Sequence, residues 1–382
     1  MPQIVHRRPD IREFVRRDPV LVIACTLAVL SCAAVPPDAH YLTYVDVRTL
    51  GLLFSLMTVM TGLTRLGVFR AACRALLRAV HGPRSLSLAL VLLTFFSSML
   101  ITNDVALVTF VPLALLALGH LKSVRLTSFT VVMMTIAANL GSMATPVGNP
   151  QNLYLYSAAR MPLGEFLILM LPFTLAALVL LVGAIVLFGR APDALPLSSA
   201  PVLADDGEDA GVPLARTVPW IVLFALALAS VARVLPWQVT VAAAVAVGIV
   251  FDRAALRHVD YALLATFVAF FVFVGNMGRI EAIDAFIAQA VVGNELVVSV
   301  VASQVLSNVP AAILLSGFTD AWRELIIGCN LGGLGTLIAS MASLISYKQF
   351  ALVHPRAKGS YLALFTGWNM VFLAVLLVFA LV

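Results

Sequence analysis

The chain has 382 residues, of which 62% are hydrophobic and only 11% are charged, and its formal net charge is +5. A soluble domain carries about 25% charged residues, so this composition excludes a water-soluble globular protein and indicates a protein that crosses a membrane several times. The positive charge does not indicate nucleic-acid binding, because the Arg residues lie in short segments between apolar runs. The four Cys residues have no paired spacing, which predicts neither a disulfide framework nor a zinc site.

Taken in chain order, the apolar segments predict nine membrane crossings, since one crossing needs about 20 apolar residues. The predicted crossings are 19–36, 45–64, 126–160, 162–189, 216–235, 237–252, 259–277, 323–347 and 360–382. Two further apolar stretches, 85–119 and 294–317, each contain a polar tip and are too long for one crossing. We predict that both are re-entrant hairpins. The crossings at 126–160 and 323–347 contain glycines and polar residues, and we predict that both are broken helices.

The distribution of positive charge predicts the orientation of the chain. With a cytoplasmic N-terminus, the predicted inside segments hold 19 Lys and Arg residues and the outside segments hold 5. Such an excess is typical of cytoplasmic loops, so we predict a multi-pass protein of the inner membrane with its N-terminus in the cytoplasm. A cleaved signal peptide at the start is the alternative. The polar, Pro-rich segment 190–214 is predicted to be a cytoplasmic linker between the halves 1–189 and 215–382.

The two halves contain related segments. Asn-Leu-Gly-Ser-Met-Ala-Thr begins at Asn139, and Asn-Leu-Gly-Gly-Leu-Gly-Thr begins at Asn330, an offset of 191 positions (330 minus 139). Four crossings separate the crossing at 45–64 from its counterpart at 259–277, so these two run in opposite directions. The sequence therefore predicts two inverted repeats, and broken helices at equivalent places in two such repeats indicate the binding site of a secondary transporter.

The hairpin tips and the broken helices supply the candidate substrate-binding residues. Non-helical backbone at membrane depth is tolerated only where it is buried in protein or faces a cavity, so hydroxyls and amides there are available to a ligand. The predicted substrate-binding residues are Thr102, Asn103, Thr145, Gly148, Asn149, Gln151, Asn152, Ser307, Asn308, Gly335 and Thr336. The alternative is that these groups only satisfy the turns or bond neighbouring helices around a proline kink.

Asp104 is the only acidic residue that the predicted topology places deep in the apolar zone. An intramembrane carboxylate is costly and typically marks a proton relay or a cation ligand, so we predict that Asp104 couples transport to an ion. The other predicted ion-coupling residues lie in the broken helices: Asn139, Gly141, Asn330 and Gly332. The coupling ion is expected to be a proton or sodium, and no cofactor is expected. Alternatively, Asp104 only accepts backbone amides at a helix start.

Paired hairpins with a hydroxyl-Asn tip, here Thr102-Asn103 and Ser307-Asn308, each followed by a glycine-broken helix, resemble the ion transporter superfamily. This group contains divalent-anion/sodium symporters, citrate-type carriers, arsenite permeases and certain sodium/proton antiporters. The resemblance implies that the four tip residues contribute to sodium sites and hold substrate carboxylates. The third tip position is Asp104 in one hairpin and Val309 in the other. The Asn-Asp tip is more similar to the arsenite permease and anion permease branches than to the dicarboxylate branch.

These observations predict a secondary active transporter rather than an enzyme. The expected substrate is a small anion, such as citrate, a dicarboxylate or arsenite, moved by alternating access and coupled to a proton or sodium gradient. The resemblance further implies an elevator-like movement and a homodimer, and no nucleic-acid partner is expected. The nearest alternative is a sodium/proton antiporter, and a channel is another. An intramembrane enzyme is a remote alternative, because no paired intramembrane Asp or known catalytic motif occurs.

Overall fold

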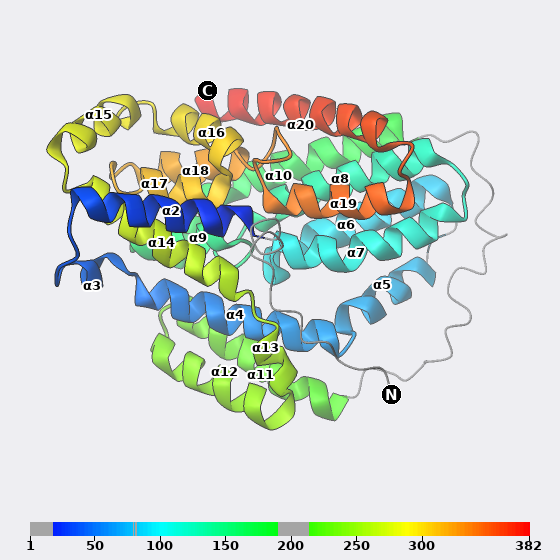
Figure 1. The fold of residues 1–382 in the computed structure, drawn as a ribbon. Helices are drawn as coiled ribbons and strands as arrows, with labels where there is room; N and C mark the ends of the chain where they lie inside the picture. The colour runs from blue at the N-terminus through cyan, green and yellow to red at the C-terminus, as the bar shows by residue number, and fades with distance from the viewer. Residues whose placement is uncertain (1–17, 79, 81, 190–213) are drawn as a thin grey trace, which may run out of the picture.

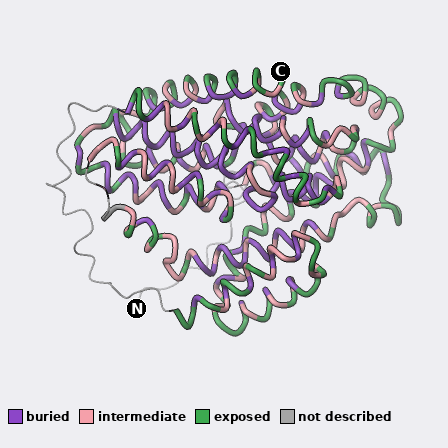
Figure 2. Tube along the Cα trace, turned by 180° about the vertical axis from the view of Figure 1, so that it is seen from behind, coloured by how far each residue is buried: buried purple, intermediate pink, exposed green. Residues whose placement is uncertain are grey.

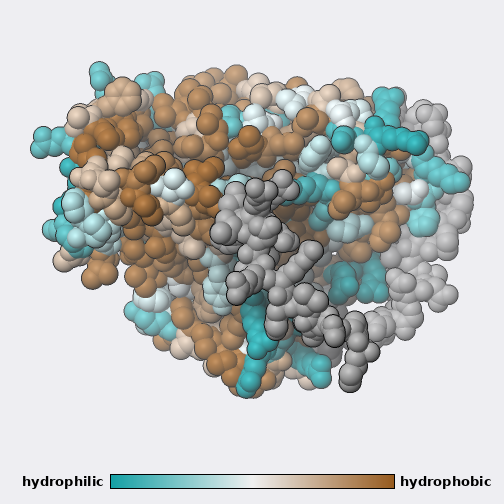
Figure 3. Space-filling view, in the orientation of Figure 1, coloured by the Kyte–Doolittle hydropathy of each residue, from teal (hydrophilic) through white to brown (hydrophobic). Residues whose placement is uncertain are grey.

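The computed structural model of the chain describes residues 18–78, 80, 82–189 and 214–382. Its regular elements are 19 α-helices, with no strand in these ranges, as the all-α prediction requires (Figure 1). Six described helices are long and apolar enough to cross a membrane, or seven if the bent pair α14 and α15 is one span. Large apolar side chains cover much of the face in Figure 3, as expected for a surface in contact with lipid.

Several of the nine predicted crossings do not correspond to one helix of membrane-spanning length. The predicted crossings 19–36 and 237–252 correspond to helices of 16 and 15 residues, which are shorter than the length of about 20 residues that spans a bilayer. The predicted crossings 126–160 and 323–347 are each interrupted. Conversely, the helix Pro83–Ile101 is long enough to span, although we predicted it as one arm of a hairpin.

Five helices form what we call the flanking group. They are α2 (Pro19–Ala34), α4 (Val47–Arg65), α11 (Leu214–Val231), α12 (Trp237–Phe251) and α14 (Tyr261–Met277). Helix α2 packs along α14, and α4 packs against both α11 and α12 (Figure 1). The shorter helices associated with them are α3 (Tyr41–Tyr44), α13 (Arg253–Arg257) and α15 (Glu281–Val291).

Ten helices form what we call the hairpin group. They are α6 (Pro83–Ile101), α7 (Asn103–Gly119), α8 (Val124–Ser142), α9 (Pro150–Ala158), α10 (Leu163–Phe188), α16 (Glu295–Leu306), α17 (Asn308–Leu315), α18 (Trp322–Leu331), α19 (Met341–Val353) and α20 (Lys358–Leu381). Helix α6 packs on α8, α16 on α18, and α7 on α19. Every residue of α8 from Leu126 to Ser142 is buried, so α8 lies at the centre of this group (Figure 2). The amphipathic helix α5 (Val68–Arg78) connects the two groups and contacts α4, α6 and α7.

The chain reverses at two tips and loses its helical form at two breaks. The tips are Thr102, with φ 62°, and Ser307, with φ 76°, a left-handed conformation that residues with a side chain rarely adopt. The breaks are the segments 143–149 and 332–340, between α8 and α9 and between α18 and α19. Proline lacks an N–H and glycine costs backbone entropy in a helix, which explains why the helices stop there. That the tip-bearing pairs are re-entrant stays a prediction.

Two ion pairs connect distant parts of the flanking group. Arg65 Nε lies 2.6 Å from Asp252 Oδ2, and Arg279 Nη2 lies 2.8 Å from Asp38 Oδ2. Asp252 follows Asp38 by 214 positions (252 minus 38), and Arg279 follows Arg65 by the same 214 (279 minus 65). Each arginine therefore pairs with the aspartate of the other half.

We expect Asp38→Asn to lower the melting temperature slightly at neutral pH and to have no effect in strong acid. The hydrogen bond from Arg279 holds the pKa of Asp38 below its usual value. The stabilisation is therefore fully present above the ordinary Asp pKa of about 3.9 and is lost as the pH falls through the lowered native value. Thermal melts of both proteins in detergent across this range test it. A difference that is the same at every pH would contradict the assignment.

Candidate functional site

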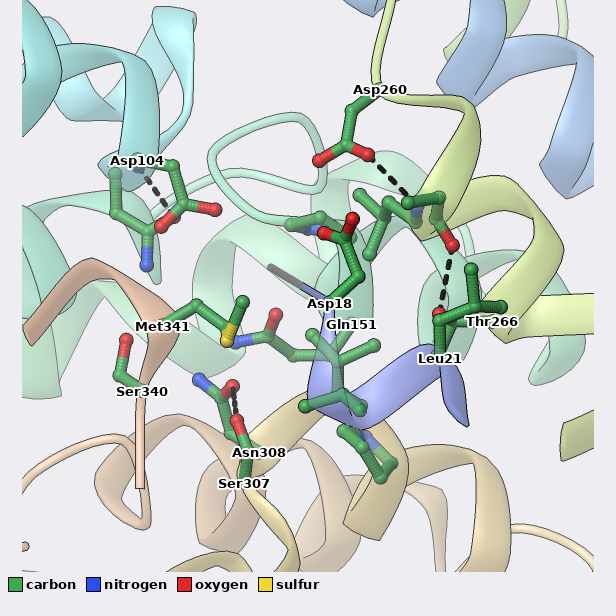
Figure 4. Close-up of a pocket in the computed structure, with 17 residues that line it drawn as sticks. Asp18, Leu21, Asp104, Gln151, Asp260, Thr266, Ser307, Asn308, Ser340 and Met341 are labelled. Atoms are coloured by element: carbon green, nitrogen blue, oxygen red, sulfur yellow. Dashed lines mark hydrogen bonds between the residues drawn. The ribbon is translucent and has the colours of Figure 1, made fainter. Parts of the chain in front are cut away.

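Six helices begin at one cavity in the middle of the molecule. The cavity has a volume of about 70 Å³, which is room for several waters or a small solute. Its lining residues are Asp18, Val20, Leu21, Asn103, Asp104, Pro150, Gln151, Asp260, Ala262, Leu263, Thr266, Ser307, Asn308, Val309, Pro310, Ser340 and Met341 (Figure 4). They belong to the first two turns, or to the residue just before them, of α2, α7, α9, α14, α17 and α19. Helix N-termini present free N–H groups and a partial positive charge, so this convergence favours negatively charged atoms.

The helices approach the cavity from opposite directions. In Figure 1, α7 and α19 extend to the right from the middle of the molecule, and α2, α14 and α17 extend to the left. Helices α7 and α17 begin at the two tips, and α9 and α19 begin at the two breaks. Both tips and both breaks therefore contribute residues to the lining of one cavity.

The charged side chains of the cavity are three aspartates. Asp104 lies at the start of α7 in the hairpin group, and Asp18 and Asp260 directly precede α2 and α14 in the flanking group. Asp104 Oδ1 is buried and has no hydrogen-bond partner in the described part of the chain. Asp260 Oδ1 accepts a bond of 2.9 Å from the N–H of Leu263 and so caps α14. No Lys, Arg or His is among the described residues that line the cavity.

Each tip is bonded to the break of its own half. The N–H of Asn103 donates to the carbonyl of Gly148 at 3.1 Å, and the N–H of Asn308 donates to the carbonyl of Ala339 at 3.0 Å. These two N–H groups lie at helix starts, where they have no partner within the helix. The bonds therefore fix the tips against the breaks.

A second pair of bonds holds the middle of each break. Thr145 Oγ1 donates to the carbonyl of Met99, and Thr336 Oγ1 donates to the carbonyl of Gln304 at 3.2 Å. The Gln304 side chain also accepts from the N–H of Thr336 and donates to the carbonyls of Gly332 and Leu334. The side chain of Gln304 thus bonds the second break, whereas Met99 bonds the first break only through its backbone carbonyl.

Asn139 in α8 reaches from the first half into the second break. Its Oδ1 accepts from Asn103 Nδ2 at 3.1 Å and from Ser340 Oγ at 3.0 Å. Its Nδ2 lies within bonding distance of the carbonyl of Gly333, at 3.3 Å, and of Ser343 Oγ, at 3.4 Å. Asn139 is 4% exposed, so these bonds form away from water.

Asn330 in α18 makes the reciprocal connection to the first break. Its Nδ2 donates to Asn152 Oδ1 at 2.6 Å, and its Oδ1 accepts from Asn149 Nδ2 at 3.3 Å. Ser340 and Ser343, the partners of Asn139, follow Asn149 and Asn152 by the same 191 positions that separate the two asparagines. Each asparagine therefore bonds the break of the other half through equivalent positions. We call Asn139 and Asn330 the crossed asparagines.

The structure brings five of the predicted site residues to the cavity wall: Asn103, Asp104, Gln151, Ser307 and Asn308. The other predicted residues do not line it and instead form, bond or pack against the tips and breaks; they are Thr102, Thr145, Gly148, Asn149, Asn152, Gly335, Thr336, Asn139, Gly141, Asn330 and Gly332. Sequence reasoning missed Asp18, Asp260 and Ser340 as cavity residues. The Val-Asp pair at Asp260, which recurs at Asp46, signals a helix start but not its position beside the cavity.

Comparison with known proteins identifies the family of the chain. The sequence profile described as citrate transporter matches residues 10–321, which include both tips and the first break. The chain belongs to the citrate transporter family. This confirms the resemblance to the ion transporter superfamily predicted from the tips.

The relatives of this citrate transporter family member are transporters and membrane proteins. It is 31% identical over 280 residues to an uncharacterized transporter of Methanocaldococcus jannaschii, covering 71% of this chain and 73% of that protein. It is 28% identical over 313 residues to the inner membrane protein YbiR of Escherichia coli, covering 80% of each. A silicon efflux transporter of Oryza sativa subsp. japonica is 35% identical over 134 residues, covering 35% of this chain and 27% of that protein. The chain is therefore a membrane transporter and not an enzyme.

Proposed function

We propose that this protein is a secondary active transporter of the inner membrane that carries a small carboxylate or oxyanion together with a proton or a sodium ion. The observation that carries the proposal is the convergence of six helix N-termini on a cavity that also contains Asp104. The N-termini supply partial positive charge to an anion. The acidic side chains repel an anion unless a cation accompanies it, which is the requirement of a symporter.

The proposed mechanism is alternating access by two inverted repeats, residues 1–189 and 215–382. The equivalent bonds of Asn103 and Asn308, and the reciprocal bonds of the crossed asparagines, support this assignment because they recur at the offsets of the sequence repeat. The hairpins 85–119 and 294–317 then belong to the moving part. Most of the proposed linker, residues 190–213, lies outside the described residues.

The proposed movement is a displacement of the hairpin group against the flanking group. The separate packing of the two groups supports it, with α14 and α17 among the helices that meet at their boundary. A homodimer and an elevator-like movement are proposed from the superfamily resemblance. The cytoplasmic N-terminus rests on the distribution of Lys and Arg, and residues 1–17 lie outside the described residues.

One observation favours a second candidate substrate class, an uncharged oxyacid. Among the described lining residues, the charged side chains are all carboxylates, which accept hydrogen bonds from O–H groups without needing a countercharge. The silicon efflux transporter among the relatives is in keeping with such a substrate. A thermal-shift screen against citrate, a dicarboxylate, arsenite and silicic acid separates the two classes, because a ligand of the folded state raises its apparent stability.

We expect Asp104→Asn to reduce gradient-driven uptake in proteoliposomes to background. Asparagine neither carries the negative charge that attracts a cation nor exchanges a proton at physiological pH. Uptake of each labelled candidate substrate is measured with an imposed sodium or pH gradient. The control is Asp46→Asn, which removes a carboxylate that does not line the cavity. Unchanged uptake and unchanged pH dependence in the Asp104 variant would remove its coupling role.

A further inference from the structure

Asp104 and Asp260 face one cavity from different helix groups. Asp104 belongs to α7 of the hairpin group, and Asp260 caps α14 of the flanking group (Figure 4). Both carboxylates line the same cavity, where two negative charges repel one another. The third carboxyl group that faces the cavity is that of Asp18. The negative charges of Asp104 and Asp260 at one cavity favour the binding of a positive charge there.

The described lining supplies no such charge. It contains no basic side chain, and the buried Oδ1 of Asp104 accepts no hydrogen bond from any described residue. Helix N-termini contribute only partial charges, and the bond that Asp260 accepts already satisfies one of the N–H groups of α14. Within the described lining, Asp104 therefore has no positively charged partner.

Gln151 independently indicates a missing ligand. Its side chain lines the cavity, is only 1% exposed, and forms no hydrogen bond with the residues that the structure describes. Buried amides are almost always hydrogen-bonded, so an exception in a cavity points to a group that binds there. Figure 4 shows the Gln151 side chain extending into the space between Asp104 and Asn308. The amide of Gln151 carries a neutral oxygen, Oε1, at the same cavity as the carboxylates.

We propose that Asp104, Asp260 and Gln151 bind one singly charged cation, tested first as sodium, at the boundary between the hairpin group and the flanking group. Among the described residues no three His, Cys, Asp or Glu side chains are grouped closely enough to hold a metal ion, so neutral oxygens complete the shell. The site differs from the sodium sites expected at the tips, since Asp260 belongs to neither hairpin. The inference rests on the proposed function, because Asp104 is the coupling carboxylate of the proposed transporter.

The position of this site gives the cation a second role. Its ligands come from two groups of helices that are proposed to move against one another, so the site is complete only while the groups face each other as they do here. A ligand stabilises the conformation that it binds best. The cation therefore holds the transporter in the present conformation, and its release permits the movement.

The experiment is a sodium titration of the thermal stability of the full-length protein in detergent, without substrate or gradient, with choline keeping the ionic strength constant. We expect a saturable rise in melting temperature for the wild type and none for Asp104→Asn. We expect Asp260→Asn to raise the sodium concentration at half-saturation about tenfold, since it removes one nearby charge from the ion. Gln151→Leu is also expected to raise the sodium concentration at half-saturation.

The repeat provides a matched control. Asp46 Oδ1 caps α4 through the N–H of Thr49 at 3.0 Å, as Asp260 Oδ1 caps α14 through the N–H of Leu263 at 2.9 Å. Only Asp260 lines the cavity, so Asp46→Asn should keep the wild-type sodium affinity. If Asp260→Asn does not fold, Asp260→Ser retains a capping oxygen without the charge and is used in its place.

The outcomes separate this site from the proposed function. Sodium affinity that is unchanged by the Asp260 and Gln151 substitutions overturns the site, even if uptake still depends on Asp104. Stabilisation by calcium but not by sodium also overturns it. Sodium affinity that depends on Asp104, Asp260 and Gln151 supports the site, even if no candidate substrate is transported and the proposed function fails.

Discussion

Gly141→Ala is expected to disrupt the packing of α6 on α8 and to leave little folded protein. A Cβ atom at this position would lie 2.2 Å from the carbonyl oxygen of Phe95 and 2.9 Å from its carbonyl carbon. Both atoms belong to the backbone of α6, so no side-chain rotation relieves the clash. Overpacking of a core costs about 1–3 kcal/mol and occasionally more, and we expect at least about 3 kcal/mol here. The measurement is the fraction of monodisperse protein in detergent and its melting temperature.

Two other glycines act as controls for this substitution. A Cβ atom at Gly183 in α10 would have no neighbouring atom within 4 Å, so Gly183→Ala should be neutral or stabilising by about 0.5–1 kcal/mol. A Cβ atom at Gly332, the counterpart of Gly141, would lie 2.6 Å from Ser303 Oγ and 2.7 Å from Ser303 Cβ. These contacts are less severe than the 2.2 Å contact at Gly141, so Gly332→Ala should have an intermediate effect. A Gly141 variant as stable as the Gly183 variant would show that the two helices do not approach so closely.

Asn330→Ala is expected to destabilise the protein by about 3 kcal/mol, because each buried polar group that loses its partner costs about 1–3 kcal/mol. The substitution removes the donor to Asn152 Oδ1 and one of the two acceptors of Asn149 Nδ2, which also donates to Ser142 Oγ. Both partners are buried, so water does not replace the lost bonds. Thermal and denaturant unfolding in detergent measure the effect, and substrate uptake shows whether the first break has also lost its shape.

Asn369 is a matched control for Asn330. It is also fully buried in a helix, but its Nδ2 donates only to the carbonyl of Phe365 in the preceding turn, and its Oδ1 has no described partner. Asn369→Ala removes no bond between segments and should be much less destabilising. Equal losses in the two variants would mean that the crossed bonds contribute nothing beyond the burial of an asparagine.

The sequence predicts the parts of the site that depend on local chemistry. Glycine and proline mark the breaks, the hydroxyl-Asn pairs mark the tips, and the constant offset relates the two halves. Asp104 is recognisable because a carboxylate is costly within an apolar run. The all-helical fold follows from composition, and the positions of the breaks follow from Gly141, Pro150 and Gly335.

The parts that were missed depend on packing between distant segments. Asp260 resembles an ordinary helix cap in the sequence, and only the approach of α14 to the tips brings it to the cavity. The sequence does not predict the bonds that the crossed asparagines form, because their partners lie about half a chain away. The rule that one crossing needs about 20 apolar residues also does not give the number of crossings, since α2 and α12 are shorter than that.

The crossed asparagines have a consequence for biosynthesis. Asn149 is made 181 residues before its partner Asn330, which is roughly 9–36 s at a synthesis rate of about 5–20 residues per second. During this interval the amides of the first break lack their final partners, and unpaired amides are costly in lipid. The first half should therefore stay at the membrane insertion machinery, or in contact with water, until the second half arrives. Separately produced halves should each be degraded in the cell, whereas co-produced halves should rescue one another.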